Sequence, residues 1–142
     1  MTKIKICGIT NMDDARAAVN LGADALGFVF YNKSKRYIDP KEASRIAEAL
    51  PPFVKKVGVF SNEEEKIVNE IKAAVNLDLL QIHGDEDPEY CGRLNGPYIK
   101  AFRIKDKSTL DEVNSYQTET LKYITSPALD RGIYVRRGAQ LG

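Results

Sequence analysis

Apolar and polar residues follow two different periods along the chain. Short, nearly continuous apolar runs of strand length alternate with longer stretches in which apolar residues recur at helical spacing. The strand pattern occurs at residues 3–7, 25–30, 53–60, 77–82, 98–104 and 121–124. Strands that alternate with helices are typical of βαβ units, whose strands run parallel. The sequence therefore predicts a parallel α/β fold.

Capping residues mark where the intervening helices begin. Asp39-Pro40 and Asp87-Pro88 each combine an N-cap with a proline at the first helical position. Thr10, Asn62 and Ser108 are polar residues of the kind that opens a helix, and each stands between a predicted strand and a helical stretch. These signals predict five helices, which start near the five positions named.

Two α/β architectures fit this order of elements. A doubly wound open sheet of flavodoxin or receiver type is usually about as long as this chain. A (βα)8 barrel typically needs about 250 residues, and the 142 residues here hold about five βα units and a sixth strand. Length favours the open sheet. A receiver, however, would carry acidic residues after its first strand, where this chain has Cys7-Gly8.

Composition narrows the function classes. With 43% hydrophobic and 29% charged residues, the chain can bury one domain core beneath a solvated surface. Lys and Arg total 21 against 20 Asp and Glu, so no basic surface suits nucleic acid. No apolar run approaches the roughly 20 residues of a membrane span, and no signal-peptide pattern opens the chain. We expect a cytoplasmic protein with neither nucleic acid nor membrane as partner.

The cysteines and the histidine limit the chemistry further. Cys7 and Cys91 lie far apart without a CxxC motif, and His83 is the single histidine, so we expect no disulfide framework and no metal site. Cys7 ends the first predicted strand, and α/β folds bind their ligands at the carboxyl ends of strands. A thiol there is either catalytic or a small buried residue.

Five stretches, in order, resemble phosphoribosylanthranilate isomerase, a (βα)8-barrel family of tryptophan biosynthesis. The first is Lys-Ile-Cys-Gly-Ile-Thr at residues 5–10. The others are residues 27–31 with 34–38, 57–60, 80–86 and 99–102. Because the five occur in family order and at family-like spacing, the resemblance covers residues 3–124.

The resemblance implies an Amadori rearrangement of N-(5-phosphoribosyl)anthranilate, without a cofactor. A general acid protonates the furanose ring oxygen, and a general base then removes the proton from C2′ of the Schiff base. It implies that Cys7 is this base and that Arg36 faces the anthranilate carboxylate, which suits a guanidinium fork. His83 would line the substrate site.

The resemblance also implies a departure after the sixth strand. There the family continues with an aspartate, the general acid, whereas residues 121–124 here run into Thr125-Ser126-Pro127. The seventh and eighth units, where this fold usually builds its phosphate site, have no counterpart. We therefore expect residues 1–124 to form a truncated (βα)8 barrel and residues 125–142 a divergent tail, whose order the sequence leaves open. A reading-frame change near residue 125 is one hypothesis for the tail.

An incomplete barrel has consequences for assembly and for activity. Its first and last strands would lack partners, and its apolar interior would be open. We therefore expect a homodimer that covers these edges, with weak or absent isomerase activity. The alternatives are a catalytically dead fragment that self-associates and, from a different class, a flavodoxin-like or receiver-like binding module.

Overall fold

The computed structural model describes residues 3–103, 106–113, 115–116 and 121–125. In these ranges strands and helices alternate along the chain, as predicted. The strands are β1 (Lys5–Cys7), β2 (Ala25–Val29), β3 (Lys55–Phe60), β4 (Leu79–Ile82), β5 (Tyr98–Arg103) and β6 (Leu121–Thr125). The helices are α1 (Met12–Asn20), α2 (Pro40–Glu48), α3 (Glu65–Val75), α4 (Pro88–Gly92) and α5 (Lys107–Val113).

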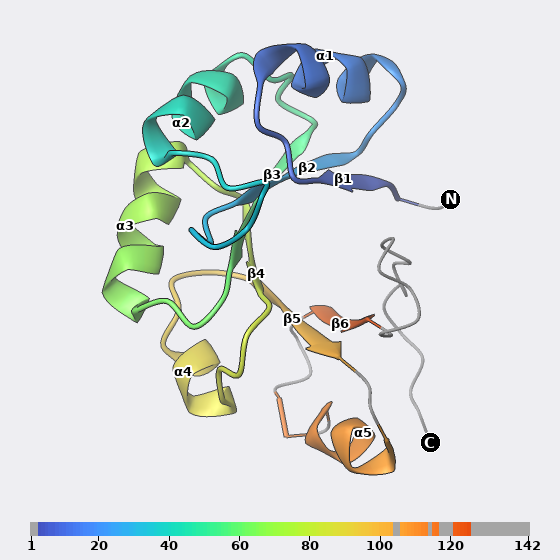
Figure 1. Ribbon diagram of the computed structural model, residues 1–142, viewed down its shortest axis with the longest axis vertical. Helices are drawn as coiled ribbons and strands as arrows, with labels where there is room; N and C mark the ends of the chain where they lie inside the picture. Colours follow the sequence, from blue (N-terminus) through green and yellow to red (C-terminus); the bar gives the residue numbers. More distant parts are fainter. Residues whose placement is uncertain (1–2, 104–105, 114, 117–120, 126–142) are drawn as a thin grey trace.

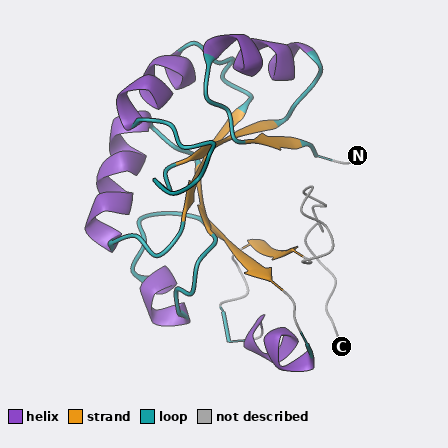
Figure 2. Ribbon diagram, in the orientation of Figure 1, coloured by secondary structure: helices purple, strands orange, loops and turns teal. Residues whose placement is uncertain are grey.

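The six strands form one parallel sheet in the order β1-β2-β3-β4-β5-β6. Each strand therefore lies beside its neighbour in sequence, and the sheet curves with the helices along its outer side (Figure 1, Figure 2). A doubly wound fold reverses its strand order at a switch point, and this sheet has no reversal. The predicted barrel-type fold is confirmed as an open half-barrel, and the flavodoxin-like or receiver-like alternative is wrong.

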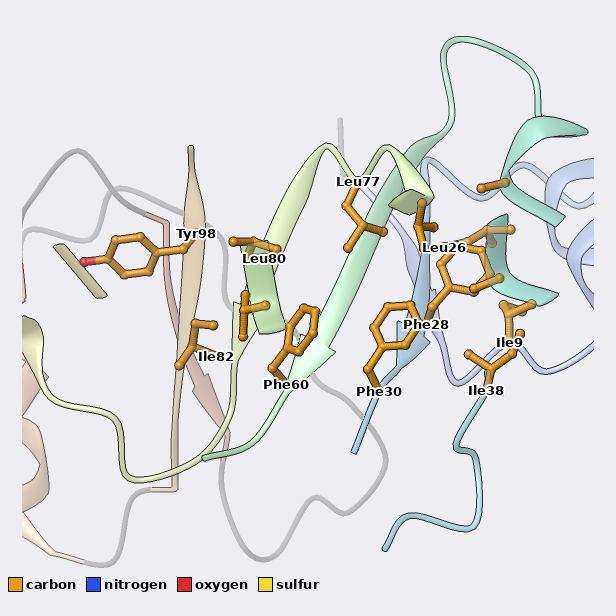
Figure 3. Packing of buried hydrophobic residues seen from close by; sticks show 14 of the residues in the cluster. Ile9, Leu26, Phe28, Phe30, Ile38, Phe60, Leu77, Leu80, Ile82 and Tyr98 are labelled. Atoms are coloured by element: carbon orange, nitrogen blue, oxygen red, sulfur yellow. The ribbon is translucent and has the colours of Figure 1, made fainter. Parts of the chain in front are cut away.

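The outer face of the sheet carries the main hydrophobic core. Phe28 of β2 is fully buried, and the rings of Phe30 and Phe60 stack with their centroids 5.4 Å apart (Figure 3). Gly58 keeps this packing close, because a Cβ there would lie 2.4 Å from Leu77 Cδ1 and 2.9 Å from Phe60. Each buried side chain of this size stabilises the fold by about 1.5–3 kcal/mol, so this layer holds the strands in place.

The opposite, concave face carries polar side chains. Successive residues of a strand point to opposite faces, so Lys5 and Cys7 share one face of β1, with Ile6 on the other. From this face Lys5 Nζ donates a hydrogen bond to Gln81 Oε1 of β4. In a flat sheet β1 and β4 would lie about 14 Å apart. The bond therefore needs a strongly curved sheet.

Three predicted helix starts were displaced by a few residues. Asn62 does not open the third helix, because it adopts a left-handed conformation (φ 53°) and its Oδ1 accepts a hydrogen bond from Asp85 N. Helix α3 instead begins at Glu65. The N-cap of α1 is Asn11 rather than Thr10, and α5 begins one residue before Ser108. Both predicted Asp-Pro starts are confirmed, with Asp39 and Asp87 as N-caps.

The edges of the described sheet are β1 and β6. Among the strands described, β1 pairs with β2 alone and β6 with β5 alone. The predicted divergent tail lies outside the described residues from position 126 onward. In the described part of the chain, no helix has the length and apolar character needed to cross a membrane.

Candidate active site

Cys7 ends β1 at the carboxyl edge of the sheet. Its register partner in β2 is Gly27, and a Cβ at position 27 would lie 2.9 Å from Cys7 Sγ and 3.2 Å from Cys7 Cα. A glycine opposite the cysteine thus makes room for the thiol on the concave face. Cys7 is partly exposed, so its sulfur occupies a packed but accessible position.

Arg36 comes to the same place from the loop between β2 and α2. Its Nη1 donates a hydrogen bond of 3.3 Å to the carbonyl oxygen of Cys7, and its own backbone N–H donates to Ser34 Oγ at 3.1 Å. The side chain crosses directly over Gly8, where an added Cβ would lie 2.4 Å from Arg36 Cδ. Gly8 also has φ +85°, a conformation that favours glycine. Gly8 therefore allows the chain to turn and Arg36 to reach Cys7.

Cys7 and Arg36 share a groove of about 330 Å³, with Asp14 of α1 and the apolar side chains Ile4 and Ile6 along it. The Arg36 side chain is exposed, and a guanidinium presents five N–H donors in a planar fork. With Nη1 directed at the Cys7 carbonyl, other donors of the fork can face the groove. This arrangement can hold a planar carboxylate at the carboxyl end of β1, where Cys7 lies.

His83 lies elsewhere on the same edge of the sheet. It follows β4 directly, and its backbone N–H donates a hydrogen bond of 2.9 Å to Phe60 O. Its exposed side chain lines a cavity of about 700 Å³, which also includes Asn62 and Lys100. The structure therefore brings Cys7 and Arg36 into one groove and puts His83 in another.

A buried ion pair organises the loop that contains His83. Lys100 Nζ donates to Gly84 O at 2.6 Å and lies 3.4 Å from Glu86 Oε1. The other carboxylate oxygen of Glu86 accepts from Asn62 N at 2.8 Å, and Tyr116 Oη donates to Glu86 O at 2.5 Å. The pair thus ties the loop after β4 to the loop after β3 and to Tyr116, which follows α5 in the chain. Sequence reasoning missed Glu86, although a lysine inside an apolar strand is a signal that a buried partner exists.

The two thiols have different environments. Burial raises the pKa of the Cys91 thiol to about 11, assisted by the nearby carboxylates Glu86 and Asp87. A thiol that keeps its proton is neither a base nor a nucleophile, so Cys91 is a core residue. The described residues contain no group of three side chains that could hold a metal ion.

A parallel half-barrel with a thiol and a guanidinium together at the carboxyl ends of its first strands defines part of a (βα)8-barrel enzyme scaffold. A family model described as N-(5'phosphoribosyl)anthranilate (PRA) isomerase matches residues 4–134. The chain belongs to this family.

Individual relatives agree with the family model. An N-(5'-phosphoribosyl)anthranilate isomerase of Trichlorobacter lovleyi is 51% identical over 117 residues, which are 82% of this chain and 57% of the relative. A phosphoribosyl anthranilate isomerase solved in complex with reduced 1-(o-carboxyphenylamino)-1-deoxyribulose 5-phosphate is 43% identical, with a TM-score of 0.84. A structure described as monomers of the dimeric enzyme from Thermotoga maritima is 40% identical, also with a TM-score of 0.84. Each alignment with a solved structure covers 89% of this chain and 66% of the other. The chain thus spans between half and two thirds of these relatives.

Proposed function

We propose that the chain holds the general base and the carboxylate clamp of a phosphoribosylanthranilate isomerase site, for an Amadori rearrangement in tryptophan biosynthesis. The observation that carries the proposal is the contact between Arg36 Nη1 and the Cys7 carbonyl at 3.3 Å. Because this contact holds the guanidinium at the carboxyl end of β1, where Cys7 lies, a carboxylate on the guanidinium would hold the sugar of the same substrate near the thiol.

In the proposed reaction, the Cys7 thiolate takes the proton from C2′ of the ring-opened Schiff base. The electrons of the C–H bond form a C1′–C2′ double bond, and the electrons of the C=N bond move to nitrogen, which already carries a proton because acid-assisted ring opening leaves the Schiff base protonated. The enolamine that results becomes the aminoketose. Arg36 acts by orientation, since its fork fixes the anthranilate carboxylate. We include His83 as a residue that lines the substrate site further along the sheet edge.

We propose that the isomerase rate of this chain is low. The family carries its general acid directly after the sixth strand, and this chain has Thr125, Ser126 and Pro127 after residue 124, none with a carboxyl group. Loss of general acid catalysis typically costs about 10²–10⁴ in rate. The proposed role of Cys7 is separate from this loss, because proton abstraction at C2′ is a distinct step that acts on the ring-opened Schiff base.

Growth of a tryptophan-requiring bacterial strain that lacks this isomerase tests the proposed activity. Strong expression of the chain should restore slow growth without tryptophan, and Cys7→Ala should abolish it. Cys91→Ala is the matched control, because it removes the other thiol from the core and should still permit growth. Failure of the wild-type chain to restore growth, or rescue by Cys7→Ala, would contradict the proposal.

We further propose that residues 1–124 act as a partial barrel that self-associates through its open side. Ile4 and Ile6 of the β1 edge are 49% and 41% exposed, and an edge strand with apolar side chains favours pairing with another chain. Sedimentation equilibrium at micromolar concentration should show a homodimer. Ile6→Lys should shift the equilibrium to monomer, whereas Phe53→Ser, which removes a 94% exposed ring outside this edge, should not. A monomeric wild-type chain would refute this assembly.

A further inference from the structure

Lys5 is a second charged residue on the face of β1 that carries the thiol. We infer that Lys5 is a positioning residue, whose ammonium, held in place by Gln81, stabilises the thiolate of Cys7. This inference deepens the proposed function and rests on it. It concerns the base itself, however, so it can be tested without any substrate.

The geometry of β1 brings the two groups together. Lys5 and Cys7 are two residues apart in one strand, so their side chains leave the same face about 6.6 Å apart along it. Their register partners in β2 are Ala25 and Gly27, both small, and the space at Gly27 is taken by Cys7. The hydrogen bond to Gln81 Oε1 then fixes the ammonium on the concave face.

The partner that holds Lys5 is itself fixed. Gln81 is 4% exposed and lies in β4, between the register positions of Val59 and Ile99. A carboxylate in its place would neutralise the ammonium. A neutral amide oxygen accepts the hydrogen bond and leaves the full positive charge available to the sulfur.

Electrostatics supports this pairing. Burial lowers the pKa of Lys5, whereas the negative charge of Cys7 raises the same pKa and partly opposes the effect of burial. Coulomb attraction is mutual, so the ammonium that the thiolate stabilises also stabilises the thiolate. Among the described residues, two further charged groups line the groove of Cys7. They are Arg36, which faces its carbonyl oxygen, and Asp14 of α1.

The rate of Cys7 alkylation by iodoacetamide, followed from pH 6 to pH 10, measures the thiolate directly. In this reaction the sulfur forms a bond to carbon as the carbon–iodine bond breaks and iodide leaves. Mass spectrometry of the labelled peptides separates Cys7 from the buried Cys91. Lys5→Met should slow alkylation at pH 7 several-fold and move the profile to higher pH. Lys5→Arg, which keeps the charge, should restore most of the rate.

Lys3→Met is the matched control. It removes the same charge from the same end of the chain, but Lys3 is 74% exposed and pairs with Asp24 at 3.7 Å, so the profile should stay as in the wild type. Gln81→Leu, which releases the ammonium without removing it, should give a smaller shift in the same direction as Lys5→Met. The inference would be overturned if Lys5→Met gave the same pH profile of alkylation as Lys3→Met. It would also be overturned if Lys5→Arg slowed alkylation as much as Lys5→Met. The two proposals can fail separately. If the alkylation profiles are as expected but the chain does not restore growth, the isomerase proposal is overturned and the pairing of Lys5 with Cys7 remains intact.

Discussion

Lys100 and Glu86 form an ion pair that is almost completely excluded from water. Nζ lies 3.4 Å from Oε1, and both side chains are 3% exposed. The ammonium also donates to Gly84 O and lies 5.5 Å from the centre of the Phe102 ring. Because each charge depends on the other for its stability, loss of one leaves the other buried and uncompensated.

Substitution of one partner should therefore destabilise the half-barrel strongly. We expect Lys100→Met to lower the free energy of unfolding by about 3–5 kcal/mol, as measured by urea denaturation. The exposed pair Arg45–Glu42 is a control, and Arg45→Met should have little effect on the free energy of unfolding, because water screens this pair. A double variant, Lys100→Met with Glu86→Leu, should recover part of the loss, because it removes both charges. Equal costs at Lys100 and Arg45 would show that the buried pair does not organise the loop.

The stability of the fold should fall as the pH rises above 9. The ordinary pKa of a thiol is 9.0, and burial raises the pKa of Cys91 to about 11. Between these values the unfolded chain releases a proton that the folded chain keeps, so alkaline pH favours the unfolded state. The contribution of the protonated Cys91 thiol to the free energy of unfolding is complete below pH 9. It is lost as the pH rises toward 11.

Urea midpoints at intervals from pH 8 to pH 10 would measure this slope. Tyr90 and Tyr116, whose pKa burial raises from 10.0 to about 12, contribute a similar loss mainly above this range. Cys91→Ala should make the profile flatter than in the wild type. An unchanged slope in that variant would mean that Cys91 ionises equally easily in both states.

Gly8 should be needed for the position of Arg36. Gly8→Ala puts a methyl group where Arg36 Cδ lies and forces a non-glycine residue to φ +85°, a strain of about 1–2 kcal/mol. We expect weaker calorimetric binding of reduced 1-(o-carboxyphenylamino)-1-deoxyribulose 5-phosphate and a lower melting temperature.

Gly92→Ala is the matched control for Gly8→Ala. Gly92 lies in α4 with nothing within 4 Å of an added Cβ, and alanine favours a helix by up to about 1 kcal/mol relative to glycine. Affinity and melting temperature should therefore be maintained. Equal affinity in the two variants would indicate that Arg36 does not contact the ligand.

The order of the elements was predictable from sequence, because local patterns determine it. Apolar runs gave the strands, and the two Asp-Pro pairs gave correct helix starts at Asp39 and Asp87. The helix start predicted at Asn62 was wrong, because the Asn62 side chain does not cap α3. Its Oδ1 instead accepts a hydrogen bond from the backbone N–H of Asp85, in the loop after β4. An N-cap preference is local, whereas this contact depends on how β3 and β4 are paired.

The candidate site shows the same division between local and long-range information. Cys7 could be placed at a strand end from its flanking residues, and family motifs pointed to Arg36. The hydrogen bond from Lys5 to Gln81 joins residues 76 positions apart and depends on the curvature of the sheet. The pairing of Lys100 with Glu86 likewise depends on which loop covers β5. Neither contact leaves a periodic signal in the sequence.

The conversion of N-(5-phosphoribosyl)anthranilate by the purified chain, followed by chromatography at high protein concentration, measures whether Cys7 acts as the base of the isomerisation. The wild-type chain should form the aminoketose faster than the uncatalysed background, at a rate about 10²–10⁴ below that of a complete relative. Cys7→Ala should reduce the rate to background, while Cys91→Ala should not. A wild-type rate equal to background, or an undiminished rate in Cys7→Ala, would contradict Cys7 as the base of this isomerisation.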